Sequence, residues 1–216
     1  MVAPKGILTS STQMVDHSRH FGTPLHHAKC AVVLVHGRDQ DAKWMRQNVI
    51  DHVDTDGVSW IVPSAPGNSW YPGRYDDPPE VNHQHLQYAL ETVELSVAAA
   101  TTAVGRSQVV IAGFSQGACV VGEFALRNPS KYGGVFLWTG VPITRIPVQG
   151  SFDGSDVYLS VGGNDQWLPA GESARAAGVF WLAGATIHTA QYPDGDHLIR
   201  PQDISQLASV LHGLKQ

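Results

Sequence analysis

A serine flanked by two glycines carries the strongest chemical signal in the chain, in the segment Gly113-Phe114-Ser115-Gln116-Gly117. On a sharp strand-to-helix turn, such a serine has its hydroxyl lifted clear of the sheet. The residues two before and two after must be small, because their Cβ atoms would collide with the turn. The helix that follows adds a partial positive field for a developing oxyanion. We therefore predict that Ser115 is a nucleophile; a chance Gly-x-Ser-x-Gly in a Gly-rich chain is the competing interpretation.

An aspartate and a histidine further along the chain complete a catalytic set. His197 would accept the proton of Ser115 and return it to the leaving group, while Asp165 would hold the imidazole in the required tautomer. The chain order Ser, Asp, His is the order found in one class of α/β enzymes. Asp194 and Asp196 are alternatives for the acid. They share the loop of His197 and cannot easily reach the far side of its ring, so Asp165 is preferred.

Two backbone amides are predicted to stabilise the oxyanion. One belongs to Gln116, directly after the nucleophile, and the other comes from the loop that follows an earlier strand. There the pair His36-Gly37 precedes Arg38, and the glycine lets the main chain turn inward so that Arg38 presents its N–H. His36 is then expected to brace this loop by hydrogen bonds and not to act as a base. An ordinary tight turn would also explain the His-Gly pair.

The elements that must position these residues alternate along the chain. Apolar, β-branched runs predict strands, and amphipathic or Ala-rich stretches between them predict helices. Several runs are apolar on both faces, as in a parallel sheet covered on both sides. We therefore predict a single-domain α/β fold with a mostly parallel, doubly wound sheet of about six to eight strands. The predicted strands are 30–35, 58–62, 108–112, 134–138, 156–161 and 186–192, and the predicted helices are 83–104, 116–127, 170–183 and 202–214.

Ligands of such sheets gather outside the carboxyl ends of the strands, which is where the predicted catalytic residues lie. The domain is expected to span residues 29–216, preceded by a lead over residues 1–28 that is either an edge strand or irregular. Four histidines of that lead suggest a metal cluster at first sight: His17, His20, His26 and His27. They lack paired cysteines and a His-x-x-x-His spacing, so no metal site is predicted.

Composition excludes several classes of protein. The 216 residues are 43% hydrophobic and only 15% charged, which excludes a disordered or coiled-coil chain. A net charge of −5 gives no general attraction for nucleic acid or an anionic membrane. Cys30 and Cys119 lie in apolar runs, which suits a reducing compartment. Without an apolar signal segment or a membrane span, we expect a soluble cytoplasmic protein with a small-molecule partner, for which a homodimer is possible.

Together these motifs resemble the phospholipase/carboxylesterase family of small α/β-hydrolases, which includes acyl-protein thioesterases and dienelactone-hydrolase-like esterases. The matching segments run from Val32 to Arg38, from Gly113 to Gly117, from Asp165 to Pro169 and from Tyr192 to His197. The resemblance implies a serine hydrolase of carboxylic esters or thioesters with no metal or organic cofactor. It implies a triad of Ser115, Asp165 and His197, with the amides of Arg38 and Gln116 as oxyanion donors.

The resemblance extends to an aromatic loop, Ala65 to Pro72, that is similar to one in the bacterial esterases of this family. It suggests that Trp70 and Tyr71 line the substrate pocket, and Trp167 is a third candidate. Packing of these rings onto the sheet is an equally good interpretation.

The connection after Trp138 has about seventeen residues, too few for a cap domain, which favours short- to medium-chain esters in an open site. A lysophospholipase or acyl-protein thioesterase acting on long acyl chains is the alternative. A non-catalytic binding protein is less favoured.

Overall fold

The protein folds around one seven-stranded sheet, seen in a computed structural model that describes residues 18–143, 148–193 and 196–216. The spatial order is β1-β3-β2-β4-β5-β6-β7, and every neighbouring pair is parallel except β1 and β3. The mostly parallel α/β architecture predicted from the sequence is therefore confirmed. The strands are β1 (Arg19–Gly22), β2 (Cys30–Val35), β3 (Val58–Val62), β4 (Val109–Phe114), β5 (Gly134–Trp138), β6 (Asp156–Gly162) and β7 (Thr186–Tyr192).

The central strands are buried on both faces because helices cover each side of the sheet. Every residue of β2, β3, β4 and β5 is buried, which explains their continuous apolar sequences. The edge strand β1 lies within the predicted lead and pairs antiparallel with β3. The sheet therefore begins before residue 29, and residues 19–22 of the lead belong to it. His17, from the histidine-rich segment, lies outside the described residues.

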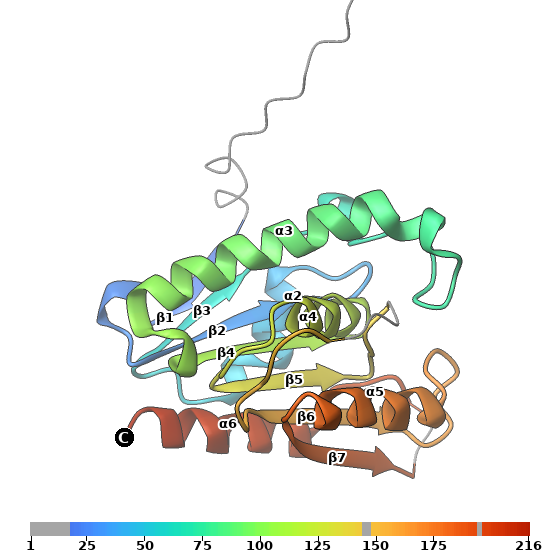
Figure 1. Ribbon diagram of the computed structural model, residues 1–216. Coiled ribbons are helices and arrows are strands. Elements are labelled where there is room, and N and C mark those ends of the chain that lie inside the picture. Colours follow the sequence, from blue (N-terminus) through green and yellow to red (C-terminus); the bar gives the residue numbers. More distant parts are fainter. Residues whose placement is uncertain (1–17, 144–147, 194–195) are drawn as a thin grey trace, which may run out of the picture.

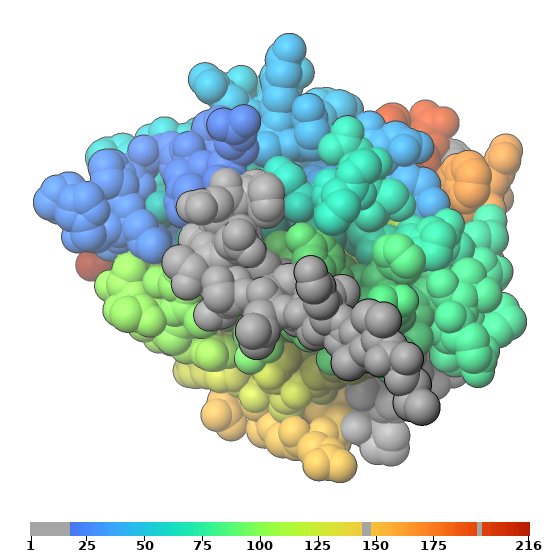
Figure 2. All heavy atoms as spheres, turned by 90° about the horizontal axis from the view of Figure 1, so that it is seen from above, coloured from blue at the N-terminus to red at the C-terminus, as the bar shows by residue number. Residues whose placement is uncertain are grey.

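Within the described ranges, five α-helices pack on the sheet (Figure 1). One hydrophobic cluster joins α3, α4 and α5 to one face, and a second joins α2 and α6 to the other. The helices are α2 (Ala42–Asn48), α3 (Pro79–Val104), α4 (Gln116–Arg127), α5 (Ala170–Leu182) and α6 (Pro201–Leu214). Figure 2 looks down on the α3 side, where residues of α3, coloured from turquoise to lime green, form a broad part of the visible surface.

Two helices differ from the prediction by more than one residue. Helix α3 starts at Pro79, four residues before the predicted start, since proline with its fixed φ is well suited to a first turn. The short helix α2 was not predicted, because only Ala42 and Met45 are fully buried and seven residues are too few to show a helical period. Its one local signal is Asp41, whose carboxylate accepts the Trp44 amide at 2.8 Å and caps the helix.

The loops that follow the parallel strands gather at one end of the sheet, toward which the arrowheads of β5 and β7 point in Figure 1. Ser115, Asp165 and His197 all lie in these loops, directly or shortly after β4, β6 and β7. None of the helices in the described ranges is both long and apolar enough to cross a membrane.

Candidate active site

Ser115 occupies a strained turn between β4 and α4. Its φ of 54° lies in the left-handed region that side chains rarely adopt, and its amide donates to the carbonyl of Trp138 at 2.9 Å. A Cβ atom on Gly113 would come within 2.5 Å of the backbone of Gly117, and one on Gly117 would lie 2.3 Å from the carbonyl oxygen of Val35. Both glycines are therefore required by close backbone contacts, for the steric reason predicted from the sequence.

His197 joins Ser115 and Asp165 through two short hydrogen bonds. Its Nε2 atom lies 2.7 Å from the Oγ of Ser115, and its Nδ1 atom lies 2.7 Å from the Oδ2 of Asp165. A carboxylate oxygen accepts hydrogen bonds, so the proton of the neutral ring lies on Nδ1 and Nε2 is left to accept from the serine hydroxyl. The structure thus brings together the three residues that the sequence placed in one site.

Asp165 is held in place by its own loop. Its side chain is completely buried, and its second oxygen, Oδ1, accepts from the amides of Trp167 at 2.8 Å and Leu168 at 3.1 Å. These bonds leave Oδ2 directed at the imidazole. Of the two alternative acids, Asp194 lies outside the described residues, and the side chain of Asp196 is not the partner of His197 Nδ1.

The amides of Arg38 and Gln116 are available for a ligand. Neither donates a hydrogen bond to another group within the described residues. A Cβ atom built on Gly37 would lie 3.2 Å from the Cβ of Ser115, so the chain that leads into Arg38 runs directly past the nucleophile. Two free amides beside a serine hydroxyl are the arrangement that stabilises an oxyanion.

The side chains of Arg38 and Gln116 have a second role that the sequence analysis missed. In the side chain of Gln116, Oε1 accepts from the backbone N–H of Trp70 at 2.8 Å, and Nε2 donates to the carbonyl of Tyr71 at 2.7 Å. The Arg38 guanidinium donates to the carbonyls of Tyr71 at 3.1 Å, Pro72 at 3.0 Å and Gly73. The side chains of Arg38 and Gln116 therefore hold the aromatic loop beside Ser115 through these hydrogen bonds.

This aromatic loop borders a cavity of about 670 Å³ that opens at Ser115 and His197. Tyr71 and Trp167 both line the cavity. Tyr71 is only 3% exposed, whereas Trp167 is 60% exposed and stands at the edge. Their placement is compatible with the predicted contact with substrate.

The remaining predicted substrate-binding residue, Trp70, does not line this cavity. Its side chain is 1% exposed, and its indole Nε1 donates to the carbonyl of His36 at 2.8 Å instead of facing the cavity. The two adjacent rings therefore differ in place, since Tyr71 lines the cavity while the Trp70 indole is held in the core by the carbonyl of His36.

At the inner side of the cavity, Tyr71 meets Cys119. Their side chains are hydrogen-bonded, and burial raises the pKa of both the phenol and the thiol. Both groups are therefore neutral at physiological pH. Cys119 lies one helical turn after Ser115, and its amide donates to the carbonyl of Ser115 at 3.1 Å. The pair contributes uncharged, close-packed surface to the cavity.

Thr139 is a neighbour of His197 that the sequence analysis did not single out. It follows β5 with a φ of 53°, which is unusual for a β-branched residue, and its Oγ1 lies 3.4 Å from the Nε2 of His197. The next residue, Gly140, is close to the nucleophile, since a Cβ there would lie 2.5 Å from the carbonyl oxygen of Ser115. The Thr-Gly pair directly after an apolar run was the available signal.

His36 braces the loop and is kept neutral by its surroundings. Its Nδ1 donates to the carbonyl of Gly37 at 2.7 Å, and its Nε2 accepts the amide of Ala65 at 3.1 Å. Burial lowers the pKa of His36 below its ordinary value of 6.5. An accepting Nε2 requires the neutral ring, so His36 has the structural role that the sequence predicted.

We expect His36 to make the folded protein less stable as the pH falls. Between the unfolded pKa of 6.5 and the lowered folded pKa, His36 is protonated in the unfolded chain but neutral in the folded protein. Unfolding therefore takes up a proton in this range and becomes more favourable as the pH falls. The free energy of unfolding should then fall by at most about 1.4 kcal/mol per pH unit from this group. Urea unfolding of the wild type and His36→Gln at about pH 7.5 and about pH 5.5 measures this loss.

The exposed His85 of α3 supplies the control, as His85→Gln should keep the pH dependence of the wild type. Equal pH dependence in His36→Gln and the wild type would contradict the expectation.

Within the described ranges, no group of three or more His, Cys, Asp or Glu side chains is arranged to hold a metal ion. The acid–base chemistry of this site can be written with the protein's own groups.

Comparisons with known proteins agree with this arrangement. The model of the Phospholipase/Carboxylesterase family matches residues 22–214. A phospholipase/carboxylesterase from Dyadobacter fermentans is 28% identical, with a TM-score of 0.83 over 91% of this chain and 96% of that chain. No curated protein sequence matches this chain.

Two more distant structures share the fold alone. A carboxylesterase from Mesorhizobium loti is 17% identical, with a TM-score of 0.70 over 86% of this chain and 90% of that one. SOBER1 from Arabidopsis thaliana is 18% identical, with a TM-score of 0.70 over 87% of this chain and 99% of that one.

The family match covers nearly the whole chain and confirms the resemblance found in the sequence. The chain therefore belongs to the phospholipase/carboxylesterase family of α/β-hydrolases and is a carboxylic ester hydrolase.

Proposed function

We propose that this protein is a serine carboxylesterase that hydrolyses short- to medium-chain carboxylic esters through Ser115, His197 and Asp165. The observation that carries the proposal is the pair of 2.7 Å hydrogen bonds that joins the serine hydroxyl, the imidazole and a buried carboxylate. This array opens into a cavity large enough for a small ester.

The reaction begins with attack of the Ser115 hydroxyl on the ester carbonyl carbon. Nε2 of His197 takes the hydroxyl proton as the C–O bond forms, and the negative charge passes to the carbonyl oxygen. The amides of Arg38 and Gln116 donate hydrogen bonds to that oxygen. Asp165 stabilises the imidazolium through Nδ1 and itself remains ionised.

The tetrahedral intermediate then collapses to an acyl-enzyme. His197 gives its proton to the departing alcohol oxygen, and the acyl group stays on Ser115. A water molecule then attacks the acyl carbon while His197 takes one of its protons, and His197 returns that proton to the Ser115 oxygen as the bond to the acyl group breaks and the carboxylic acid leaves. No further reactant is needed for either half of the reaction.

The open surroundings of the site favour small esters. The described part of the connection between β5 and β6 contains no helix that would cover Ser115. Tyr71 and Cys119 limit the depth of the cavity on one side, and the exposed Trp167 stands at its mouth. An acyl or alcohol group of modest length can contact these side chains without the need for a lid.

One observation favours the alternative, a long-chain acyl hydrolase. A second cavity of about 840 Å³ adjoins the first, and Tyr75 and Asp77 line both. Leu86 and Ile143 give the second cavity apolar walls, but Arg127 and Arg175 also line it. A long chain would have to run past these charged groups, so the shorter substrate is preferred.

Hydrolysis rates of p-nitrophenyl esters from acetyl to palmitoyl test the proposal. We expect kcat/KM to be highest for acyl chains from acetyl to octanoyl and to fall for longer ones. A maximum at palmitoyl, together with turnover of lysophosphatidylcholine or palmitoyl-coenzyme A, would favour the long-chain alternative. A fluorophosphonate probe should label Ser115 in the folded protein and leave Ser115→Ala unlabelled. Absence of both labelling and turnover would favour a non-catalytic binding protein.

A further inference from the structure

Arg200 is buried between the His197 loop and the first turn of α6. Its side chain is polar and charged, yet the residue is only 6% exposed. One guanidinium nitrogen donates to the carbonyl of Asp196 at 2.8 Å, and the other donates to the carbonyl of Leu198 at 3.1 Å. These carbonyls belong to the residues directly before and after His197. The guanidinium therefore holds the backbone on both sides of the imidazole.

The guanidinium is itself fixed by the elements on both sides of the loop. It stacks on the ring of Tyr192, the last residue of β7, with its Cζ 4.3 Å from the ring centroid. The hydroxyl of Tyr192 donates to Oδ1 of Asp203 at 2.9 Å, and the amide of Arg200 donates to Oδ2 at 2.9 Å. Asp203 lies in the first turn of α6 and is also buried. Strand, arginine and helix therefore form one connected unit.

His197 needs such support because it lies in neither a helix nor a strand. Its ring must meet Ser115 on one side and Asp165 on the other, and productive geometry tolerates only about 0.5 Å of displacement. Phe114 packs near the ring, with centroids 5.4 Å apart, but an apolar contact sets no direction for hydrogen bonds. The rigid, forked guanidinium suits two carbonyl acceptors better than a single ammonium does.

We propose that Arg200 is a positioning residue for His197, holding the imidazole between Ser115 and Asp165 through the carbonyls of residues 196 and 198. The inference rests on the proposed function, in which His197 is the general base. Arg200 does not line the cavity and acts through the loop alone.

Arg200→Met tests the proposal, because methionine fills much of the same space without the two donors. We expect kcat to fall by about 10- to 100-fold with little change in KM, the loss typical of a displaced catalytic group. In proton NMR, the far-downfield signal of the His197 Nδ1 proton should broaden or vanish. That signal is assigned by its absence in Asp165→Asn. Arg200→Lys should recover part of both, since an ammonium keeps the charge and can reach one carbonyl.

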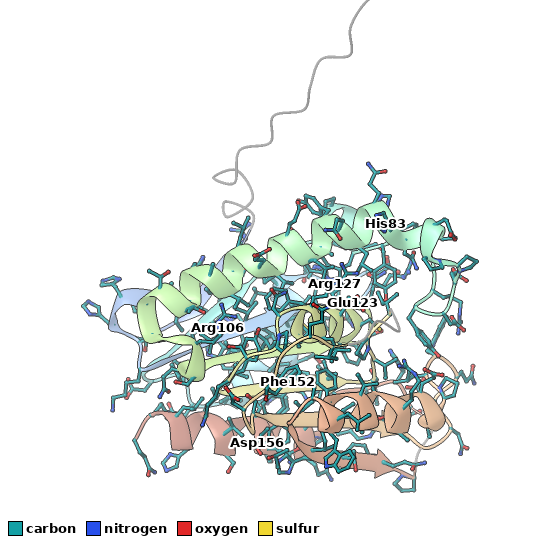
Figure 3. The ribbon with its side chains drawn as sticks, viewed as in Figure 1. His83, Arg106, Glu123, Arg127, Phe152 and Asp156 are labelled. Carbon is teal, nitrogen blue, oxygen red and sulfur yellow. The ribbon has the colours of Figure 1, made fainter. Side chains whose placement is uncertain are left out.

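Arg106 supplies a matched control at the other end of the sheet. Its guanidinium also lies over a tyrosine, with its Cζ 5.5 Å from the ring centroid of Tyr132 and its Nη1 donating to the hydroxyl at 3.2 Å. Figure 3 shows Arg106 beside the carboxyl-terminal end of α3, away from the end of the sheet that holds Ser115. Arg106→Met should lower the unfolding temperature but leave kcat and the downfield signal unchanged.

The proposal is overturned if folded Arg200→Met keeps kcat within twofold of the wild type and retains the signal. It is also overturned if Arg106→Met loses as much kcat for an equal loss of stability. If Arg200→Met does not fold, Arg200→Lys decides, and unchanged kcat and signal in that variant reject the role. A wild type without esterase turnover would contradict the proposed function, whereas the signal would still report whether Arg200 holds His197 against Asp165.

Discussion

Ser115→Ala is expected to lower kcat for p-nitrophenyl acetate by about 10⁴- to 10⁶-fold, as loss of the nucleophile does in serine proteases. The hydroxyl lies 2.7 Å from the Nε2 of His197, and alanine has no atom there to attack the ester. The fold should survive, because the Ser115 amide, which bonds to the carbonyl of Trp138, is unchanged. Purified variant and wild type, compared in the same ester assay with far-ultraviolet circular dichroism, give the measurement.

Ser96 of α3 provides the control for this substitution. It is a buried serine whose hydroxyl donates to the carbonyl of Thr92 at 3.1 Å, on a helix that does not carry the site. Ser96→Ala should keep the wild-type kcat. Equal turnover by Ser115→Ala and wild type would show that another group performs the attack, and the proposed mechanism would fail.

Asp165→Asn is expected to lower kcat by about 10⁴-fold while the fold is kept, as the equivalent change does in serine proteases. The two backbone amides of Trp167 and Leu168 require an acceptor, so the side-chain oxygen of asparagine should stay with them. Its NH₂ group then faces Nδ1 of His197, which must become an acceptor. The ring proton moves to Nε2, and Nε2 can no longer accept the proton of Ser115.

An aspartate–histidine pair outside the site offers a matched control. Asp156 at the start of β6 accepts from His188 at 2.7 Å, but both side chains are more than a third exposed. Figure 3 shows Asp156 at that end of β6, and it is absent from the cavity lining. Asp156→Asn should leave kcat unchanged. A pH–rate profile of Asp165→Asn that matches the wild type in both height and shape would contradict the assigned role.

Most of the fold could be read from the sequence because its elements have strong local signals. Continuous apolar runs mark the strands that helices cover on both faces. In α3, Leu86, Leu90, Val93 and Val97 recur at helical spacing, and all four are buried. The sequence did not predict the bounds of the edge strand β1 or the presence of the short helix α2. Neither element buries enough side chains to produce a periodic apolar pattern.

The residues gathered at the site could also be named in advance, because parallel strands bring their carboxyl ends to one edge. Ser115, Asp165 and His197 each follow a strand that was recognisable by itself, and the contacts of Gly113 and Gly117 have the steric origin expected of that motif. Residue types and their order along the chain were sufficient for this part of the site.

Only the tertiary structure decided which side chains surround that site and what holds them. Trp70 and Tyr71 are adjacent aromatics with similar sequence signals, yet the carbonyl of His36 binds the Trp70 indole while Tyr71 reaches the cavity. Arg38 holds the aromatic loop, and Arg200 holds the His197 loop, through hydrogen bonds from the guanidinium to backbone carbonyls. Every residue carries such a carbonyl, so the sequence contains no sign of the partner, and folding alone determines which carbonyls come within reach.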